Sequence, residues 1–281
     1  MSDLDDYRLH DAYGDSPGGR PPRSTGWLIA GVLVLTLAAA IGIYMSSSRR
    51  QVQAPQTPPP PAAREEPHRL GGEPEPIALP PLDESDAVVR TLVRGLSTHP
   101  VVAAWLATGD LVRSFTAAVA NIADGVSPGK QLNALRPQKG FAVVEKDGKY
   151  FIDPQSYDRY RTVADAVDSI DPAGAAKLYS TLKPRIEDAA GELGGPADRV
   201  DRTLERAIVT LLRTPTPEGP VQVTPSVEGI GYGFADGRLE GLSPAQKALV
   251  RMGPRNARII KTKLREIAVA LGVPPGHLPA E

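Results

Sequence analysis

Residues Trp27–Met45 form one uncharged apolar run, and a tract rich in proline follows it directly. At about 1.5 Å per residue, a helix of these nineteen residues spans roughly 28 Å, close to the thickness of the hydrocarbon core of a bilayer. The run therefore predicts a single membrane-spanning helix. A cleaved secretory signal is the alternative, because Ala38–Ala40 contains the small-residue pattern that signal peptidases cut. The long acidic segment before the run, and its continuation past the alanines, favour an uncleaved anchor.

The composition on either side of this run divides the chain into further parts. Residues 1–26 combine acidic residues with glycine and proline and hold little apolar surface, which predicts a disordered tail. Residues 46–81 are rich in proline and predict an extended, stiff linker. Residues 82–271 are long enough to bury a core and predict one soluble domain, which a flexible C-terminus at 272–281 follows.

The charges that flank the apolar run do not decide its orientation. Arg20 and Arg23 precede it and Arg49 and Arg50 follow it, so the positive-inside rule gives nearly a tie. A stiff linker is typical of a module that an anchor holds out into the cell envelope. We therefore expect a single-pass protein of the inner membrane, with its N-terminus in the cytoplasm and its C-terminal domain in the periplasm.

Apolar residues at helical spacing predict a mainly α-helical, bundle-like domain. The stripes lie in residues 88–96, 101–106, 111–122, 157–170, 178–186, 200–212 and 249–271. We expect Pro184 to kink or split one helix and Gly253–Pro254 to interrupt the last. An oxygen-bearing side chain before a proline predicts a capped helix start, and this pattern occurs at Ser127–Pro128, Asp153–Pro154, Asp171–Pro172 and Ser243–Pro244. Gln246 completes a capping box with the last of these.

One or two short β-hairpins are expected beside the helices. Phe141–Val144 and Lys149–Ile152 flank Asp147–Gly148, a dipeptide that favours a tight hairpin turn. Val221–Thr224 is expected to face part of Val227–Phe234. These strands would lie at the side of a helical body.

Three motifs resemble a known family. They are LPPLDESD at 79–86, LYSTLKP at 178–184, and SPAQK at 243–247 leading into RMGPRN at 251–256. They resemble the bacterial family called domain of unknown function 3014, and the last motif is the most specific. The resemblance covers residues 79–271 and implies a membrane-anchored proteobacterial protein with a proline-rich linker. It implies no activity and no catalytic residue.

Two Ser-x-x-Lys patterns are candidates for acyl-transfer chemistry, because that spacing brings a lysine one helical turn from a serine nucleophile in penicillin-recognising enzymes. They are Ser127 with Lys130 and Ser180 with Lys183. Those enzymes also need a Lys-Thr-Gly-like strand, whereas the Lys-Thr pair at Lys261–Lys263 lies in a predicted helix. We interpret Ser127 as a helix cap.

A pair of carboxylates could cleave glycan strands by general acid-base catalysis, but the sequence does not show which two face one another. Asp83, Asp153 and Asp171 are better explained as helix caps. The chain has no cysteine, which excludes disulfides, thiolate metal sites and cysteine nucleophiles. The histidines are too dispersed for a zinc site: His10, His68, His99 and His277. No metal and no cofactor is expected.

The formal net charge of the whole chain is only -1, but basic residues are concentrated in the C-terminal segment. This segment is therefore the strongest candidate binding site. Arg251, Arg255 and Arg258 follow helical spacing and would present a cationic strip to phospholipid head groups, anionic envelope polymers or an acidic protein. A helix break at Gly253–Pro254 suggests a required bend, where Arg255 and Asn256 would bind a carboxylate or phosphate. An ordinary solvated helix face is the competing interpretation.

The sequence therefore favours a non-enzymatic envelope module that binds a protein or an anionic envelope component. A peptidoglycan-directed hydrolase or acyl-transfer enzyme is one alternative. A cytoplasm-facing binder of nucleic acid or anionic lipid is the other, and nucleic acid is the less favoured partner because no recognised binding motif accompanies the basic segment.

Overall fold

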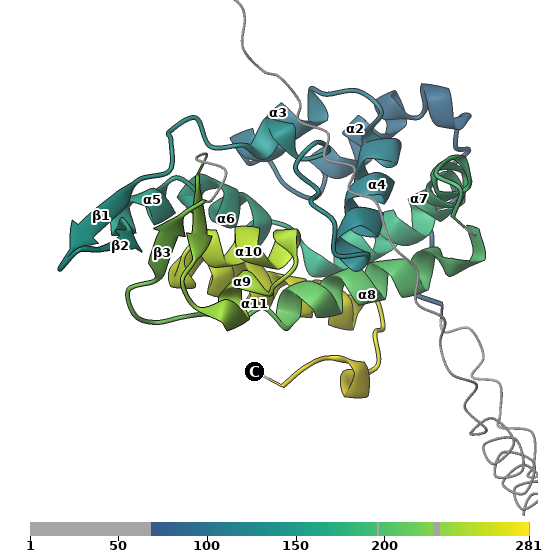
Figure 1. The fold of residues 1–281 in the computed structure, drawn as a ribbon. Coiled ribbons are helices and arrows are strands. Elements are labelled where there is room, and N and C mark those ends of the chain that lie inside the picture. Colours follow the sequence, from purple (N-terminus) through teal and green to yellow (C-terminus); the bar gives the residue numbers. More distant parts are fainter. Residues whose placement is uncertain (1–68, 196, 227–230, 281) are drawn as a thin grey trace, which may run out of the picture. The chain divides into compact units, whose positions relative to one another are not determined.

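The computed structural model of the chain describes residues 69–195, 197–226 and 231–280. They belong to one compact unit, a mainly helical domain with a small four-stranded antiparallel sheet (Figure 1). The predicted tail at 1–26, the predicted membrane helix Trp27–Met45 and linker residues 46–68 lie outside the described residues. Within the described ranges, no helix combines the length and apolarity that crossing a membrane requires.

The apolar stripes correspond to helices, and these helices pack around the two longest, Pro172–Glu192 and Pro254–Ala270. The structure has α2 (Asp86–Arg94), α3 (Pro100–Leu106), α4 (Leu111–Ala123), α5 (Pro154–Asp158), α6 (Arg161–Asp168), α7 (Pro172–Glu192), α8 (Val200–Leu212), α9 (Gly237–Glu240), α10 (Pro244–Arg251) and α11 (Pro254–Ala270). Helix α4 packs on α7 and α8, and α11 packs on α6, α7 and α8. The prediction of a mainly helical domain is thereby confirmed.

Three of the four predicted helix starts are confirmed. Asp153, Asp171 and Ser243 cap α5, α7 and α10 with their side-chain oxygens, and Gln246 completes the capping box of α10. The prediction for Ser127–Pro128 is wrong. Turns follow it, up to the short 3-10 helix η2 (Asn133–Leu135), because the segment offers too few apolar residues at helical spacing to bury one face.

The predicted interruptions of the helices are found in part. Helix α7 runs through Pro184 without splitting, since its long apolar face is buried on both sides of the proline. The stripe at 157–170 instead divides into α5 and α6, and α10 ends just before Gly253 as expected.

Both predicted hairpins form, and they join into one sheet in the order β1-β2-β3-β4. The strands are β1 (Val143–Lys146), β2 (Lys149–Ile152), β3 (Gln222–Pro225) and β4 (Tyr232–Phe234). Asp147 and Gly148 both have positive φ, as a tight hairpin turn requires. Tyr150 pairs with Val223, so a contact between distant segments converts two hairpins into one sheet.

The main apolar core surrounds α7, and segments from both ends of the domain contribute to it. Leu70, from the predicted linker, and Val273, from the predicted C-terminal segment, are each 3% exposed. The backbone N–H of Gly71 donates to the carbonyl of Leu271 at 2.9 Å. Smaller clusters lie under the sheet and between α6, α10 and α11.

The break between α10 and α11 is locked to α5 by two residues. Gly253 has a φ of +84°, and a Cβ at this position would lie 2.4 Å from Cγ of Tyr157. Asn256 is 4% exposed, and its Nδ2 donates to the carbonyls of Tyr157 and Met252, each at 2.8 Å. The RMGPRN motif therefore joins three helices at a point that only glycine fits.

We expect Gly253→Ala to lower the free energy of unfolding by about 1–3 kcal/mol or more, because a left-handed backbone strains an L-residue and the added carbon clashes with Tyr157. Urea denaturation followed by circular dichroism measures the change. Gly276→Ala is the matched control, since nothing lies within 4 Å of its Cβ position. Equal stability of the two variants would contradict the assigned role of Gly253.

Candidate functional site

The three arginines of the predicted basic strip have different surroundings. Arg251, at the end of α10, is half-buried; its guanidinium lies 4.8 Å from the ring centroid of Phe234, and Nη2 donates to the carbonyl of Tyr232. Arg255 and Arg258 are exposed on α11, and Arg258 pairs with Glu218.

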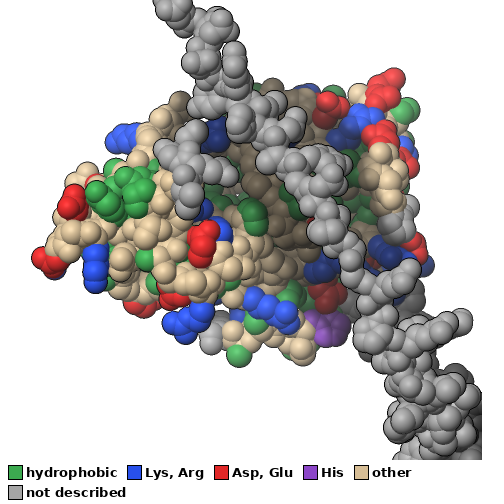
Figure 2. Space-filling view, viewed as in Figure 1, with side chains coloured by type: hydrophobic (Ala, Val, Ile, Leu, Met, Phe, Trp, Pro, Cys, Tyr) green, Lys and Arg blue, Asp and Glu red, His purple; other side chains and the backbone are tan. Residues whose placement is uncertain are grey.

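Asn256, which the sequence predicts as an anion ligand, is buried, and its amide nitrogen is used by the two carbonyls named above. Basic and acidic side chains are interspersed on the face of the domain seen in Figure 2. Binding by Arg251, Arg255 and Arg258 stays a prediction, because nothing in the structure tests it.

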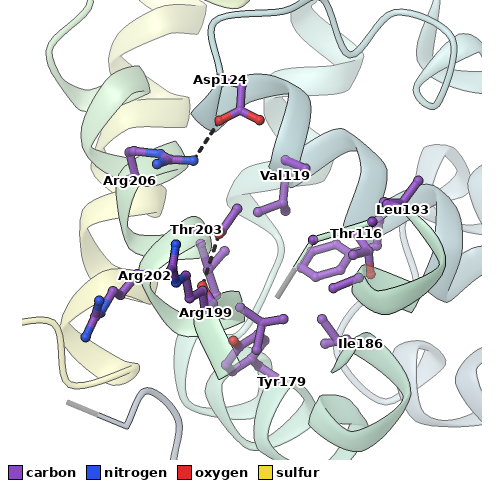
Figure 3. Close-up of a pocket in the computed structure, with 17 residues that line it drawn as sticks. Thr116, Val119, Asp124, Tyr179, Ile186, Leu193, Arg199, Arg202, Thr203 and Arg206 are labelled. Atoms are coloured by element: carbon purple, nitrogen blue, oxygen red, sulfur yellow. Dashed lines mark hydrogen bonds and ion pairs between the residues drawn. The ribbon is translucent and has the colours of Figure 1, made fainter. Parts of the chain in front are cut away.

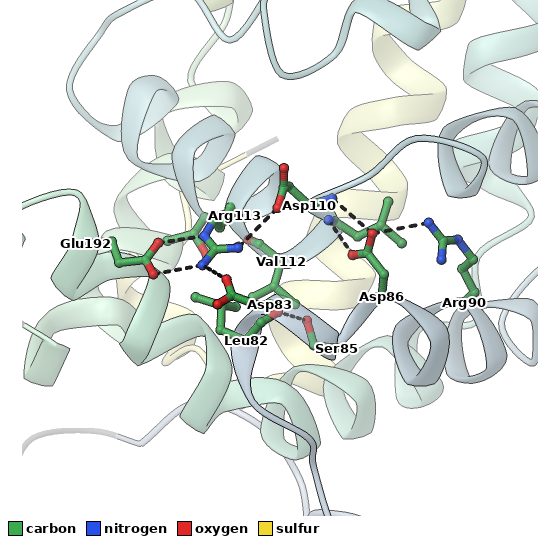
Figure 4. Close-up of polar contacts among 11 residues, drawn as sticks. Leu82, Asp83, Ser85, Asp86, Arg90, Asp110, Val112, Arg113 and Glu192 are labelled. Atoms are coloured by element: carbon green, nitrogen blue, oxygen red, sulfur yellow. Dashed lines mark hydrogen bonds and ion pairs between the residues drawn. The ribbon is translucent and has the colours of Figure 1, made fainter.

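The acidic LPPLDESD motif organises the N-terminal side of the domain around Arg113 (Figure 4). The guanidinium of Arg113 donates to Asp83 at 2.5 Å, to Asp110 at 3.1 Å and to Glu192 at 2.6 Å. The hydrogen bond from Arg113 to Glu192 lowers the pKa of the Glu192 carboxyl. The prediction that Asp83 caps a helix is thus wrong: it binds an arginine on α4, which a local sequence pattern cannot show.

Asp86 caps a helix that lies far from it in sequence. Its Oδ1 accepts the backbone N–H of Leu111 at 2.9 Å, and its Oδ2 accepts that of Asp110 at 3.0 Å and a bond from Arg90 at 3.2 Å (Figure 4). The carboxylate therefore satisfies donors at the N-terminus of α4. Asp83 and Asp86 both have structural partners.

Neither Ser-x-x-Lys pattern forms a serine–lysine hydrogen bond among the described residues. Ser180 Oγ donates to the carbonyl of Ala176, whereas Lys183 pairs with Asp201. Asp201 is 9% exposed and also accepts a bond of 2.7 Å from the hydroxyl of Tyr179. Ser127 Oγ accepts the N–H of Gly129 within a turn. The Tyr179–Asp201–Lys183 contact fastens α7 to the start of α8.

A cavity of about 520 Å³ lies between α4, the end of α7 and the start of α8 (Figure 3). We call it the arginine pocket. Its apolar wall comes from α4 and α7, with Val119, Ile186 and Leu193 visible in Figure 3, while arginines of η3 (Ala197–Arg199) and α8 lie on the other side. Leu193 is 56% exposed at the mouth. An apolar wall beside cationic side chains suits an anion with an apolar body.

The arginines of this pocket differ in their partners. Arg206 pairs with Asp124 at 2.7 Å across one end. The exposed guanidinium groups of Arg199 and Arg202 make no ion pair or side-chain hydrogen bond with any residue in the described part of the chain. Arg202 points away from the apolar wall, and Arg199 lies between Arg202 and Tyr179 (Figure 3). These two cations are available to a ligand.

A second cavity, of about 340 Å³, lies inside the helical bundle, and we call it the bundle cavity. It shares a wall with the arginine pocket, formed by Phe115, Val119, Tyr179, Ile186 and Leu204. Its lining comes from side chains of α2, α3, α4, α7, α8 and α11, and nearly all of them are apolar. A lining of this kind suits an apolar ligand.

Sequence reasoning missed both cavities, although one signal for the arginine pocket was present. Arg199, Arg202 and Arg206 are spaced three and four residues apart, so they also fall on one helical face, as the three arginines of the predicted site do. The spacing of charges on one helix does not show whether that face borders a cavity. Among the described residues, no group of three or more His, Cys, Asp or Glu side chains has the arrangement to hold a metal ion.

Comparison with known proteins gives one match. A family model described as "Protein of unknown function (DUF3014)" matches residues 111–268, which run from the first residue of α4 into α11. The match includes the arginine pocket and the SPAQK and RMGPRN motifs. No curated protein and no solved structure matches the chain.

We expect stability to fall as the pH rises above 10. Burial and the bond to Asp201 raise the pKa of Tyr179 above its ordinary value of 10.0. The unfolded chain then loses the tyrosine proton before the folded one does, so the free energy of unfolding drops by up to about 1.4 kcal/mol per pH unit.

Urea denaturation between pH 9 and 11 measures this slope. Tyr179→Phe removes the titrating group, so its stability should fall less steeply over the same interval. The remaining slope includes Tyr157, whose pKa burial also raises. Identical slopes for the two proteins would contradict the assignment.

Proposed function

The chain belongs to the family described as protein of unknown function (DUF3014), and this family brings no activity with it. We therefore propose, from the geometry, that the domain is a non-catalytic binding module. Its ligand is an anion with an apolar body, held at the arginine pocket. One observation carries this proposal: Arg199 and Arg202, which have no side-chain partner among the described residues, border a cavity whose opposite wall is apolar. Cations placed beside apolar surface attract a ligand that has both features.

The chemistry of the carboxyl groups supports a binding role over glycan hydrolysis. A glycosidase general acid needs a raised pKa, so that it holds a proton at neutral pH. Wherever the described part of the domain clearly shifts the pKa of a carboxyl, the shift is downward: Glu192, Asp236 and Glu240. Hydrogen bonds from Arg113, the backbone N–H of Arg238 and Lys247 are the respective main causes.

The serine and lysine contacts likewise favour binding over acyl transfer. A serine nucleophile needs a base within hydrogen-bond reach. Ser180 donates to a helix carbonyl, and Lys183 is held by Asp201. Acyl transfer would require both contacts to be exchanged.

The proposed module is anchored in the inner membrane by one helix, Trp27–Met45, with its N-terminus in the cytoplasm. The length and apolarity of that run support the anchor. From about residue 70 the predicted linker packs on the domain, and residues 46–69 would reach on the order of 70 Å when fully extended, which supports a domain held in the periplasm. The ligand is then a component of the envelope.

The arginine pocket is tested by removing its two unpaired charges. We expect Arg199→Gln with Arg202→Gln to weaken binding of 2-naphthalenesulfonate, a small apolar anion, about tenfold or more, because a hydrogen bond to a charged group contributes about 1.5–3 kcal/mol. Isothermal titration calorimetry of residues 65–281 measures the affinity. Both side chains are exposed, so folding should be unchanged.

The matched control is Arg255→Gln with Arg258→Gln, which removes the same charge from the basic segment that the sequence favours. We expect this variant to bind 2-naphthalenesulfonate as the unchanged protein does. Loss of binding in this variant alone would move the site to α11. Equal binding by all three proteins would contradict both locations.

The anchor gives a separate prediction. We expect the full chain to remain in the membrane pellet after washing with alkaline carbonate, because burial of the apolar run in lipid does not depend on charge. In spheroplasts, added protease should remove the domain and leave the tail protected, as immunoblots against each end would show. Release by carbonate, or a protected domain, would contradict the proposed anchoring or its orientation.

A further inference from the structure

The bundle cavity adjoins both the arginine pocket and a third cavity. The bundle cavity shares one wall with the arginine pocket. It also shares Val93, Leu96, Trp105 and Ile170 with a smaller apolar cavity of about 170 Å³. The three cavities therefore adjoin in turn, from Arg199 and Arg202 to Trp105 on α3.

The polarity of this series changes in one direction. Its first member has arginines, a threonine pair and an aspartate in its lining, whereas the two inner members are lined almost wholly by apolar side chains. A ligand that follows the series must carry its charge at one end and be apolar along the rest. A volume of about 340 Å³ also falls within the range of about 300–1,000 Å³ that is common for small-molecule sites.

The wall between the first two cavities includes residues that are only half-buried. Phe115, Val119 and Leu204 are of this kind, and all three line both cavities. Rotation of exposed or half-exposed side chains is fast compared with movement of helices. A narrow chain could pass between α4 and α8 when these side chains turn, with the helices in place.

We infer that the ligand of the arginine pocket is a lipid monomer with a single acyl chain. Its anionic head binds Arg199 at the mouth, where Arg202 adds a second positive charge, and its chain lies in the bundle cavity with its end toward Trp105. The inference rests on the proposed function and names the ligand class of the same site. The head is a carboxylate or a phosphate, since a guanidinium group binds both. Burial of the chain fills the apolar space at the centre of the bundle, and the charge stays at the mouth.

Photocrosslinking tests where the chain lies. The full-length protein, in nanodiscs, is incubated with palmitate that carries a diazirine near its terminal methyl group, irradiated, and mapped by peptide mass spectrometry. We expect adducts on peptides that contain Val93, Trp105 or Ile267, which line the bundle cavity. Adducts confined to the membrane segment or to Leu193 at the mouth would overturn the inference.

Two variants separate the chain from the head. Ala207 is buried and lines the bundle cavity but not the arginine pocket, so Ala207→Phe should reduce the inner adducts about tenfold and leave binding of 2-naphthalenesulfonate intact. The Arg199→Gln, Arg202→Gln variant should reduce both. Inner adducts that persist in the filled variant would contradict the assignment of the chain to this cavity.

A competition series uses the unmodified protein, so its result does not depend on whether a variant folds. We expect octanoate, dodecanoate and palmitate to displace the probe with increasing strength, about fourfold for each methylene that enters the cavity. Palmitoyl lysophosphatidic acid and palmitate distinguish a phosphate from a carboxylate head, and the lysophosphatidylcholine of equal chain length should compete more weakly. Equal competition by all chain lengths would overturn the inference. If the unmodified protein does not bind 2-naphthalenesulfonate at all, that result would instead contradict the proposed function.

Discussion

The hydrogen bond from Tyr179 to Asp201 is the contact on which the candidate site depends. It joins α7 to the first turn of α8, and Lys183 holds the same carboxylate from the next turn of α7. The ring of Tyr179 lies in the wall between the arginine pocket and the bundle cavity, while Asp201 stands between Arg199 and Arg202 in sequence. One buried network therefore sets both the separation of the two cavities and the position of the cations at the mouth.

The sequence motifs that resemble the family have structural roles in this domain. Asp83 and Asp86 fasten the start of the domain to α4, the SPAQK segment supplies the capping box of α10, and Gly253 with Asn256 locks the following break. A residue pattern can be specific for a fold because it solves a packing problem that no other residues solve. The proposed ligand contacts lie instead on α8, outside these motifs.

Local sequence was sufficient wherever a local interaction decided the structure. The caps at Asp153, Asp171 and Ser243 and the turn at Asp147–Gly148 are formed by neighbouring residues, and each was predictable. Ser127 has the same pattern, yet no helix follows, because a cap stabilises only a helix whose apolar face is buried elsewhere. Asp83 is bound by Arg113 on α4, which also binds Glu192 on α7. Both residues are distant from Asp83 in sequence, and so the motif alone did not reveal this contact.

The sequence by itself determined that the domain is mainly helical, with two hairpins and a break at Gly253, because apolar period, caps and turn residues act over a few positions. Only the tertiary structure decided which arginines border a cavity and which are used inside the fold. Arg251 and Arg199 each occur at helical spacing from other arginines in the sequence. In the structure, Arg251 stacks on Phe234, whereas Arg199 lies beside an open pocket. That difference arises from helix packing between segments far apart in the chain, which the order of residues along one helix does not contain.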